Sequence, residues 1–478
     1  MDELMDYVPD RVYLGLTPRD CLLVSDAQIA IVSWLFSRKL KGFLKLNIHD
    51  LTAPAYQPAW ENELVTNLKW LGVQLDELPV NSGELKVTRE SERREIYKEY
   101  LWKLLLSQKV LFFKNKTNFK ITEIIKKNGT RTAVLAFKSN AFKITENEFD
   151  PFIAKEQFDI ILDPAAIKDS ELSDFRGKVF TSRSDFTESI ILWTKSGEPG
   201  SVLARAVDLH LFEISHFVIN EKELSQLFAI REVMQALSWE MVSSIILPGV
   251  GFTHFNCIEN LRRDGYLPNT IVSILGFLGK ASQLIQGQNS EENVLRLFDP
   301  ELLATHRQLV DDEKLNTVNS YYLNTLGLDF IVKLIIPFLL KNNISLKNKA
   351  RIHQIVDFLR SYFYRLSDLA REVRIFSDDI LSVSDKVARN ILRKESAQKV
   401  LWSFLRNTKA VEKMSQDVFF NIMNTVQYET GILGRDLWQP VRVALTGSLN
   451  QYELARFSEL LGRDLCINRI STIVGNYW

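Results

Sequence analysis

Strand and helix patterns alternate at the start of this chain, and this alternation restricts the possible folds more than any other feature. Residues 11–16 have the composition of a short strand, and apolar residues then recur at helical spacing through AQIAIVSWLFSRKL. The segment FLKLNIHD that follows is a second strand pattern. Strands that alternate with helices are typical of a parallel sheet. We therefore expect a parallel sheet in the amino-terminal part of the chain.

Two further helices are expected within the first 108 residues. One extends from about Trp60 to Trp70 and stops at Gly72, and the other extends from Glu92 to Gln108. The helix before them is expected to be capped by Ser25 or Asp26, because either side chain can accept a hydrogen bond from a first-turn N–H.

The pattern changes twice further along the chain. Residues 109–143 are the most basic neighbourhood, with lysines and phenylalanines interleaved, and strand patterns return at FDIILD (158–163) and SIILW (189–193). From about Asn289 onward helical patterns dominate, so the carboxyl-terminal third should be mostly α. The predicted fold class is α/β plus all-α.

Length and charge limit the kind of protein this can be. The chain has 478 residues, of which 46% are hydrophobic, enough to bury several cores, and its length suggests roughly three domains. Lys plus Arg and Asp plus Glu number 59 each, so no net charge draws the chain to nucleic acid or to anionic lipid. A site for a polyanion must therefore be a local patch.

Neither a membrane span nor a disulfide framework is expected. The most apolar stretch, FIVKLIIPFLL at 330–340, is too short to cross a bilayer, and the acidic start is neither a secretory signal nor a transit peptide. The cysteines, Cys21, Cys257 and Cys466, are odd in number, far apart and without CxxC spacing, which argues against both a disulfide framework and a zinc cluster. We expect a soluble, cytoplasmic protein with no bound metal.

Six phrases of the chain resemble the glutamyl-tRNA synthetase family in the same order. They are WENELVTNLKWLGVQLDE (60–77), ESERREIYKEY (90–100), VLARAVDLHLFEISHFVINEKELS (202–225), RRDGYLPNTIVSILGFLG (262–279), KLNTVNSYYL (314–323) and WQPVRVALTGSLNQYELARFSELLG (438–462). Their colinear order over more than four hundred positions argues against chance similarity.

The resemblance implies a domain plan. Residues 1–108 and 187–288 would form a Rossmann-like class I synthetase catalytic domain, and residues 109–186 an inserted acceptor-binding subdomain. Residues 289–365 would form a helical stem-contact region, and residues 366–478 a helical anticodon-binding domain.

The chain departs from this family where the family binds ATP. The His-Ile-Gly-His-type motif places imidazole and backbone amides at a helix amino terminus against the phosphates. The matching positions are Leu23, Val24, Ser25 and Asp26, so a carboxylate replaces the last imidazole. At an effective dielectric near 20, two unit charges about 4 Å apart repel by roughly 4 kcal/mol, or nearly three decades in affinity. We expect ATP binding to be weak or absent.

The family's second phosphate-binding element, a flexible Lys-Leu-Ser-Lys-Arg loop, is also missing. Residues 246–268 connect the flanking landmarks by a shorter route that contains no lysine, and Arg262 and Arg263 beside the later landmark do not restore the motif. Loss of one preorganised donor typically costs about 2.7 to 4 kcal/mol of transition-state stabilisation. Both changes affect the same triphosphate.

The residues that recognise the amino acid are altered as well. The family's two arginines fall at Tyr13 and Ile219, its serine at Thr17 and its tyrosine at Ser201, so a substrate glutamate would lack its cationic partners. We identify no replacement pocket in the sequence. His49 beside Asp50 could form an acid–base pair, although no nucleophile is evident near them.

Two groups of basic residues are candidates for RNA contact. Lysines with interleaved aromatic residues suit phosphate contact and base stacking, and the family's insertion meets the tRNA acceptor end, but a lysine run can equally be a solvated face. The candidates are Lys114, Lys116, Lys120, Lys126, Lys127 and Arg131 in the insertion, and Arg435 and Arg442 in the last domain.

No metal site is expected. His210 and His216, which we place in a strand-rich segment together with Asp208, have no further ligand at metal-binding spacing, so structural roles are favoured.

The leading hypothesis is a synthetase-like pseudoenzyme that does not activate glutamate, needs no cofactor and binds tRNA or a protein partner as a regulatory or scaffold component. Three alternatives remain. The chain could be a divergent but active glutamate–tRNA ligase, an ATP-independent transferase that uses charged tRNA, or a subunit of a protein complex without RNA. One sequence does not name the partner or the tRNA.

Overall fold

The structure is a computed structural model, and it describes most of the chain. The described residues are 9–51, 56–76, 78–80, 83–85, 87–115, 117–127, 130–137, 140–167, 170–182, 190–277, 291–344, 349–376 and 383–477. The chain divides into two compact units. Unit 1 comprises Met1–Arg262 and Pro268–Leu315, and unit 2 comprises Arg263–Leu267 and Asn316–Trp478.

A five-stranded parallel sheet forms the centre of unit 1, as the sequence predicts. Its strand order is β15-β14-β1-β2-β5, and every neighbouring pair is parallel. Because the chain leaves β1 towards β2 on one side and returns later as β14 on the other, a crevice is expected at the carboxyl ends of β1 and β14. The strands are β1 (Arg11–Leu16), β2 (Phe43–Ile48), β5 (Val87–Arg89), β14 (His216–Asn220) and β15 (Ser243–Leu247).

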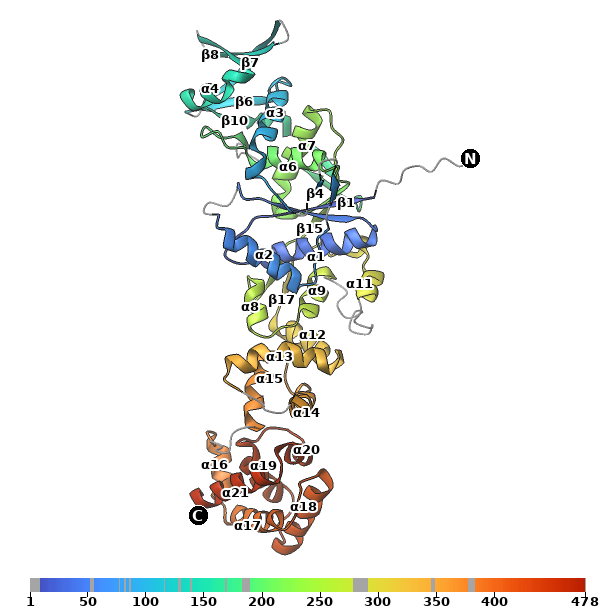
Figure 1. Cartoon of the computed structure of the whole chain (residues 1–478), viewed down its shortest axis with the longest axis vertical. Coiled ribbons are helices and arrows are strands. Elements are labelled where there is room, and N and C mark those ends of the chain that lie inside the picture. Colours follow the sequence, from blue (N-terminus) through green and yellow to red (C-terminus); the bar gives the residue numbers. More distant parts are fainter. Residues whose placement is uncertain are drawn as a thin grey trace, which may run out of the picture. The chain divides into compact units, whose positions relative to one another are not determined.

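Helices cover both faces of this sheet. Figure 1 shows α1 (Val24–Lys39) and α2 (Pro58–Trp70) on one side of the sheet, and α6 (Ser201–Leu211) and α7 (Leu224–Ala236) on the other. The strands are therefore shielded on both faces, which explains why β1 and β2 consist of nearly continuous buried residues. Gly72, with a φ of 79°, ends α2 as expected.

Two local predictions are wrong. Helix α1 begins at Val24 after the N-cap residue Leu23, which has no side-chain cap, so Ser25 and Asp26 lie inside the first turn. The segment that carries Asp208 and His210 is the helix α6 rather than a strand, and its residues 202–209 are all buried, as in a helix that packs on every side. His216 does lie on a strand, β14.

An inserted antiparallel sheet shares a hydrophobic core with α3 (Arg94–Leu105), α6 and α7. Buried residues run continuously from Tyr13 through Tyr97 and Leu203 to Phe112 and Trp193. The order of this sheet is β13-β10-β6-β7-β8-β9. Its strands are β6 (Val110–Lys114), β7 (Thr117–Lys127), β8 (Thr130–Phe137), β9 (Asn140–Thr145), β10 (Asp159–Leu162) and β13 (Ile191–Trp193).

Smaller elements complete unit 1. They are β3 (Leu78–Val80), β4 (Gly83–Leu85), α4 (Phe149–Glu156), α5 (Pro164–Ile167), β11 (Glu171–Ser173), β12 (Val179–Thr181), β16 (Val250–Phe252), α8 (Ile258–Arg263), α9 (Pro268–Gly276), α11 (Glu291–Leu297) and β17 (Gln308–Val310).

Unit 2 is helical, as predicted for the carboxyl-terminal third. Its helices are α12 (Asp312–Thr325, which begins in unit 1), α13 (Leu328–Lys341), α14 (Lys349–Leu359), α15 (Leu366–Val373), α16 (Lys386–Leu392), α17 (Glu395–Lys409), α18 (Gln416–Thr430), α19 (Arg435–Thr446), α20 (Leu454–Leu461) and α21 (Arg463–Tyr477). Among the described residues of the whole chain, no helix has the length and apolar character needed to cross a bilayer.

Candidate functional site

A small polar cavity lies where the fold predicts a binding crevice, at the carboxyl ends of β1, β2 and β14. Its volume is about 40 Å³, which leaves room for water but not for a large ligand. It is lined by Gly15, Leu16, Thr17, Arg19, Asp26, Ile29, His49, Arg205, Phe217, Val218, Ile219 and Glu223.

A chain of buried polar side chains closes the floor of this cavity. The hydroxyl of Tyr13 lies 2.9 Å from Nε2 of His49, and Arg205 donates to Nδ1 of His49 at 3.0 Å. Because a guanidinium can only donate, this contact leaves the imidazole proton on Nε2. Burial and the charge of Arg205 lower the pKa of His49 well below its usual range, so the ring is neutral.

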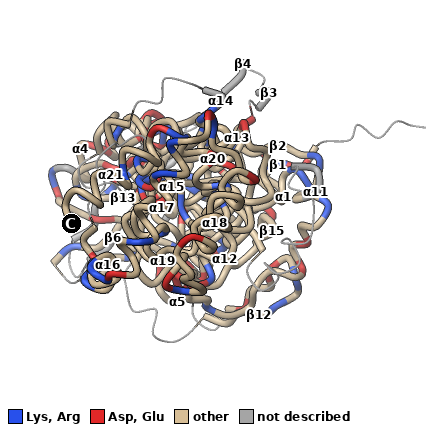
Figure 2. Tube along the Cα trace, turned by 90° about the horizontal axis from the view of Figure 1, so that it is seen from below, with Lys and Arg blue, Asp and Glu red and all other residues tan. Residues whose placement is uncertain are grey.

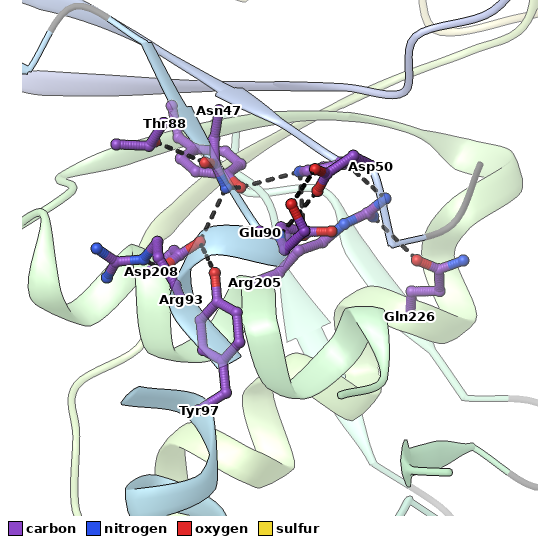
Figure 3. Close-up of polar contacts among 12 residues, drawn as sticks. Asn47, Asp50, Thr88, Glu90, Arg93, Tyr97, Arg205, Asp208 and Gln226 are labelled. Carbon is purple, nitrogen blue, oxygen red and sulfur yellow. Dashed lines mark hydrogen bonds and ion pairs between the residues drawn. The ribbon is translucent and has the colours of Figure 1, made fainter. Parts of the chain in front are cut away.

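Asp208 is the centre of a second part of the same network (Figure 3). Its carboxylate accepts hydrogen bonds from Arg93 at 2.8 Å, Tyr97 at 2.7 Å and Asn47 at 2.9 Å. Asn47 also donates to Tyr13 at 2.8 Å, which joins the two parts. Asp208 is fully buried, and this burial raises its pKa while Arg93 opposes the rise. The carboxylate of Asp208 is therefore satisfied within the protein by these three donors.

Glu90 and Asp50 flank this network. Glu90 is fully buried beside His49, at 3.7 Å between Oε1 and Nε2, and neither of its oxygens has a hydrogen-bond partner among the described residues. Burial raises the pKa of Glu90 well above its usual range, although the charge of Arg205 opposes the rise. Asp50 accepts from the backbone N–H and the hydroxyl of Ser91. The structure therefore pairs His49 with Tyr13 and Arg205, whereas the sequence suggested Asp50.

The amino end of α1 carries a carboxylate at the cavity. Asp26 lines the cavity together with Arg19 and Glu223. Burial raises the pKa of Asp26 to about 6, although Arg19 opposes the rise. Asp26 is therefore largely ionised at neutral pH, so its negative charge lies at the helix end where an anion would otherwise be favoured.

The segment after β16 is attached directly to this helix end. The N–H of Val24 donates to the carbonyl of Asn256 at 2.9 Å, and Leu23 and Cys257 form an isolated β-bridge. Cys21 and Cys257 form a disulfide with 5.9 Å between their Cα atoms. The sequence-based argument against disulfides is wrong for this pair, because the fold brings together cysteines that are 236 residues apart.

The structure brings some of the predicted amino-acid-site residues together. Thr17 and Ile219 line the cavity, and Tyr13 lies beneath it in contact with His49. Ser201 does not line the cavity and instead begins α6. Sequence reasoning missed two cations at the cavity. Arg19 lies in the loop after β1, and Arg205 lies on α6. Only the position of Arg205 within the quoted 202–225 phrase could have indicated it.

The predicted RNA contacts in the insertion fall on β6, β7 and β8. Lys114 lies 3.6 Å from Glu156, and Lys120 lies 3.5 Å from Asp163 although most of its side chain is exposed. The backbone places Lys126 opposite Arg131 in the β7–β8 pairing, and Lys127 ends β7. Lys116 lies outside the described residues, and these assignments remain predictions.

Unit 2 has an open groove on α17 and α18. Its volume is about 560 Å³, and its lining residues are Lys399, Trp402, Ser403, Leu405, Arg406, Lys409, Glu429 and Thr430. The side chain of Trp402 is 53% exposed there. Of the two arginines predicted in this domain, Arg435 is exposed at the start of α19. Arg442 instead donates to the carbonyls of Asn450 and Tyr452, both at 2.7 Å.

Charges of both signs are interspersed along the described trace in Figure 2, in agreement with the equal numbers of acidic and basic residues. Against this even distribution, the groove on α17 and α18 is a local basic region, because its lining residues include three cations and one carboxylate.

Comparison with known proteins identifies the class of protein. The profile described as "tRNA synthetases class I (E and Q), catalytic domain" matches residues 17–317, more than half of the chain. The profile described as "Anticodon binding domain" matches residues 330–474. A class I synthetase fold with a helical anticodon-binding domain is thus established.

Whole-chain relatives define the family. A protein named glutamate–tRNA ligase from Bacillus mycoides is 26% identical over 97% of this chain and 99% of its own length. A glutamate–tRNA ligase from Listeria monocytogenes is also 26% identical, over 98% of both chains. The chain belongs to the glutamyl-tRNA synthetase family. The resemblance expected from the sequence is confirmed.

A solved structure agrees on the fold. The crystal structure of a glutamate–tRNA ligase from Elizabethkingia meningosepticum, in complex with its amino acid, superposes with a TM-score of 0.78. It is 17% identical and covers 98% of this chain and 100% of its own, so this likeness shows the fold alone.

Proposed function

We propose that this protein binds tRNA and does not activate glutamate with ATP. The observation that carries the proposal is the small volume of the cavity at the carboxyl ends of the parallel sheet. Small-molecule sites usually measure about 300–1,000 Å³, whereas this cavity measures about 40 Å³. An amino acid and a nucleoside triphosphate would need far more space.

The side chains that fill this position support the proposal. Tyr13, His49 and Arg205 hold one another through hydrogen bonds of 2.9 Å and 3.0 Å, and Arg205 also donates to Glu223 and Gln226. A substrate carboxylate would have to break these contacts to reach the guanidinium. Removing a partner from a buried charged hydrogen bond is costly, so the network opposes substrate entry.

Electrostatics at the α1 amino end support it further. Asp26 lies at the first turn of α1, where the family motif holds the phosphates, and residues 246–268, which replace the lysine loop, contain no lysine. Instead, the carbonyl of Asn256 accepts the N–H of Val24. One donor that a phosphate could use is thus already engaged by the chain itself.

Unit 2 supports the retained binding of tRNA. The groove on α17 and α18 combines an exposed indole, Trp402, with the exposed cations Lys399, Arg406 and Lys409. Aromatic stacking and phosphate contact are the two components of single-stranded nucleic-acid binding. This groove lies within the part of the chain that matches the anticodon-binding profile.

Two measurements on purified protein test the proposal. Glutamate-dependent ATP–pyrophosphate exchange in the presence of tRNA is expected to be absent, while direct binding of tRNA is expected and should weaken with added salt. A relative named glutamate–tRNA ligase serves as the positive control in both assays. Exchange at a rate comparable to this control would overturn the proposal.

A second candidate function, an active ligase, is favoured by Arg19 and Arg205 at the cavity, since two guanidiniums could hold a carboxylate after rearrangement. Positive exchange would support this candidate.

Product formed from preformed glutamyl-tRNA without nucleotide would instead indicate a transferase. Retention of a partner protein after RNase treatment, without tRNA binding, would indicate a complex subunit. We propose the cytoplasm as the location.

A further inference from the structure

Four contacts fasten the segment 256–259 to the segment 21–24. Two are backbone hydrogen bonds: the Val24 N–H donates to the Asn256 carbonyl and the Ile258 N–H donates to the Leu22 carbonyl, both at 2.9 Å, and together they form the isolated β-bridge between Leu23 and Cys257. The carboxylate of Glu259 accepts from the Leu22 N–H at 3.1 Å. The disulfide between Cys21 and Cys257 is the only covalent link among the four.

This fastening closes the amino end of α1. Val24 is the first residue of the helix, and its N–H is among the first-turn donors that have no partner within a helix. The Asn256 carbonyl satisfies this donor, and Asn67 donates to Glu259 from α2 on the same side. The segment after β16 therefore covers the helix end instead of leaving it open to a ligand.

We propose that Cys21 and Cys257 are a reversible redox pair that locks this segment over the amino end of α1. A low-molecular-weight disulfide oxidises the pair by thiol–disulfide exchange. One cysteine thiolate attacks the disulfide and releases one thiol, and the second cysteine then attacks the mixed disulfide and releases the other. Two cysteine thiols and one external disulfide thus become one protein disulfide and two external thiols, and an external dithiol reverses the reaction.

Reduction leaves only weak links at this position. The remaining contacts are hydrogen bonds, each of which contributes about 0.5–1.5 kcal/mol net. A cross-link between residues 236 positions apart restricts the chain far more than any one of them. The oxidised state holds segments 21–24 and 256–259 together, and the reduced state lets them separate.

The alternative interpretation of this position is a metal-binding site. Cys21, Cys257 and Glu259 are the only group of three such donor residues within reach of one ion among the described residues. Structural zinc sites take four protein ligands, and here the two sulfurs are bonded to each other. We therefore assign the pair to redox chemistry, and zinc binding becomes an outcome of the test.

Cys466 provides an internal control. It is fully buried in unit 2, and burial raises the pKa of its thiol to about 12, so it is protected and unreactive in the folded protein. In the oxidised protein, we expect that no cysteine is alkylated before a reductant is added. After mild reduction, we expect that Cys21 and Cys257 are alkylated. Cys466 should be alkylated only after denaturation.

Hydrogen exchange measured by mass spectrometry tests the lock on the full chain. Reduction of the wild-type protein is expected to speed exchange about tenfold or more in peptides that contain Val24 and Ile258, since the closing constraint is lost. The C257S variant should exchange like the reduced wild type without reductant, and C466A should respond like the wild type. The proposal is independent of tRNA binding and of ATP activity, so its failure would leave the proposed function untouched.

Three results would overturn the lock. Exchange that does not change on reduction would show that the hydrogen bonds suffice. If Cys21 and Cys257 are still alkylated after the protein is equilibrated with a low-molecular-weight disulfide, no cross-link forms between them. One equivalent of zinc bound by the reduced protein, with slow exchange retained, would show a metal site instead.

Discussion

At the carboxyl ends of the parallel sheet, Arg205 is 6% exposed and is paired with His49, Glu223 and Gln226. In the groove on α17 and α18, Lys399, Arg406 and Lys409 are exposed around an indole. Lys399 forms an ion pair with Glu395 at 2.8 Å, and Arg406 forms one with Glu429 at 2.5 Å. The cation in unit 1 is therefore buried among its partners, whereas the cations in the unit 2 groove are exposed at the surface even where they have an ion-pair partner. The two regions therefore differ in how far their cations are exposed to solvent, and not in the kinds of residue that they carry.

The largest expected effect is on the closed site. A Cβ at Gly15 would lie 2.2 Å from Cε1 and Nε2 of His49 and 2.7 Å from Cε1 of Tyr13. Gly15→Ala should therefore displace the imidazole and lower the free energy of unfolding by about 3 kcal/mol, through overpacking and lost hydrogen bonds. Urea titration measures this. Gly251→Ala is the control, since its Cβ would meet its nearest atom at an ordinary 3.8 Å. Equal stability of the two variants would show that the network is loose.

A smaller effect is expected in the open groove. Trp402→Ala should weaken tRNA binding by about 1–3 kcal/mol, because base stacking on an aromatic ring contributes that much per base. Fluorescence anisotropy with labelled tRNA measures the dissociation constant. Phe420→Ala removes an aromatic ring that is 46% exposed on α18 outside the groove, and it should leave binding unchanged. If both variants bind like the wild type, the groove is not the RNA surface.

Asp26 should make the closed site sensitive to pH. Burial raises the pKa of Asp26 from 3.8 to about 6, so the folded protein binds this proton more tightly than the unfolded chain does. The stability that the bound proton contributes is therefore fully present below pH 3.8 and is lost as the pH rises to about 6. Asp26→Asn should therefore gain about 1–2 kcal/mol over the wild type at pH 7.5 and much less at pH 4.5. Denaturation at the two pH values measures the difference. Asp20→Asn, at an exposed position nearby, should show no such trend.

The smallest effect is expected in the insertion. Lys120→Ala should weaken tRNA binding slightly and lower the slope of log K against log salt by about one, as loss of one phosphate contact would. The effect is small because Asp163 already lies 3.5 Å from the ammonium group. Lys155→Ala, an exposed lysine on α4 outside the basic segment, is the control. An unchanged salt slope for Lys120→Ala would make this lysine part of a solvated face.

Local sequence signals predicted much of the fold. The apolar patterns at 11–16 and 43–50 correspond to β1 and β2, because strands covered on both faces need nearly continuous apolar residues. The cap of α1 was placed wrongly, since Ser25 and Asp26 favour capping in general but the chain enters the helix at Leu23. The side chains at the site were only partly predictable. Thr17, Asp26 and Ile219 came from the resemblance, whereas Arg205 did not.

The sequence by itself determined the alternation of strands and helices at the start of the chain, the helical carboxyl-terminal third and the family, because local residue patterns carry this information. Only the tertiary structure decided that Cys21 meets Cys257, that Arg205 turns inward to His49, and that Glu90 is buried without a hydrogen-bond partner among the described residues. The disulfide and the Arg205–His49 hydrogen bond join positions that are far apart in the sequence. Their geometry follows from how the parallel sheet packs against its helices, and the local pattern of residues does not contain this information.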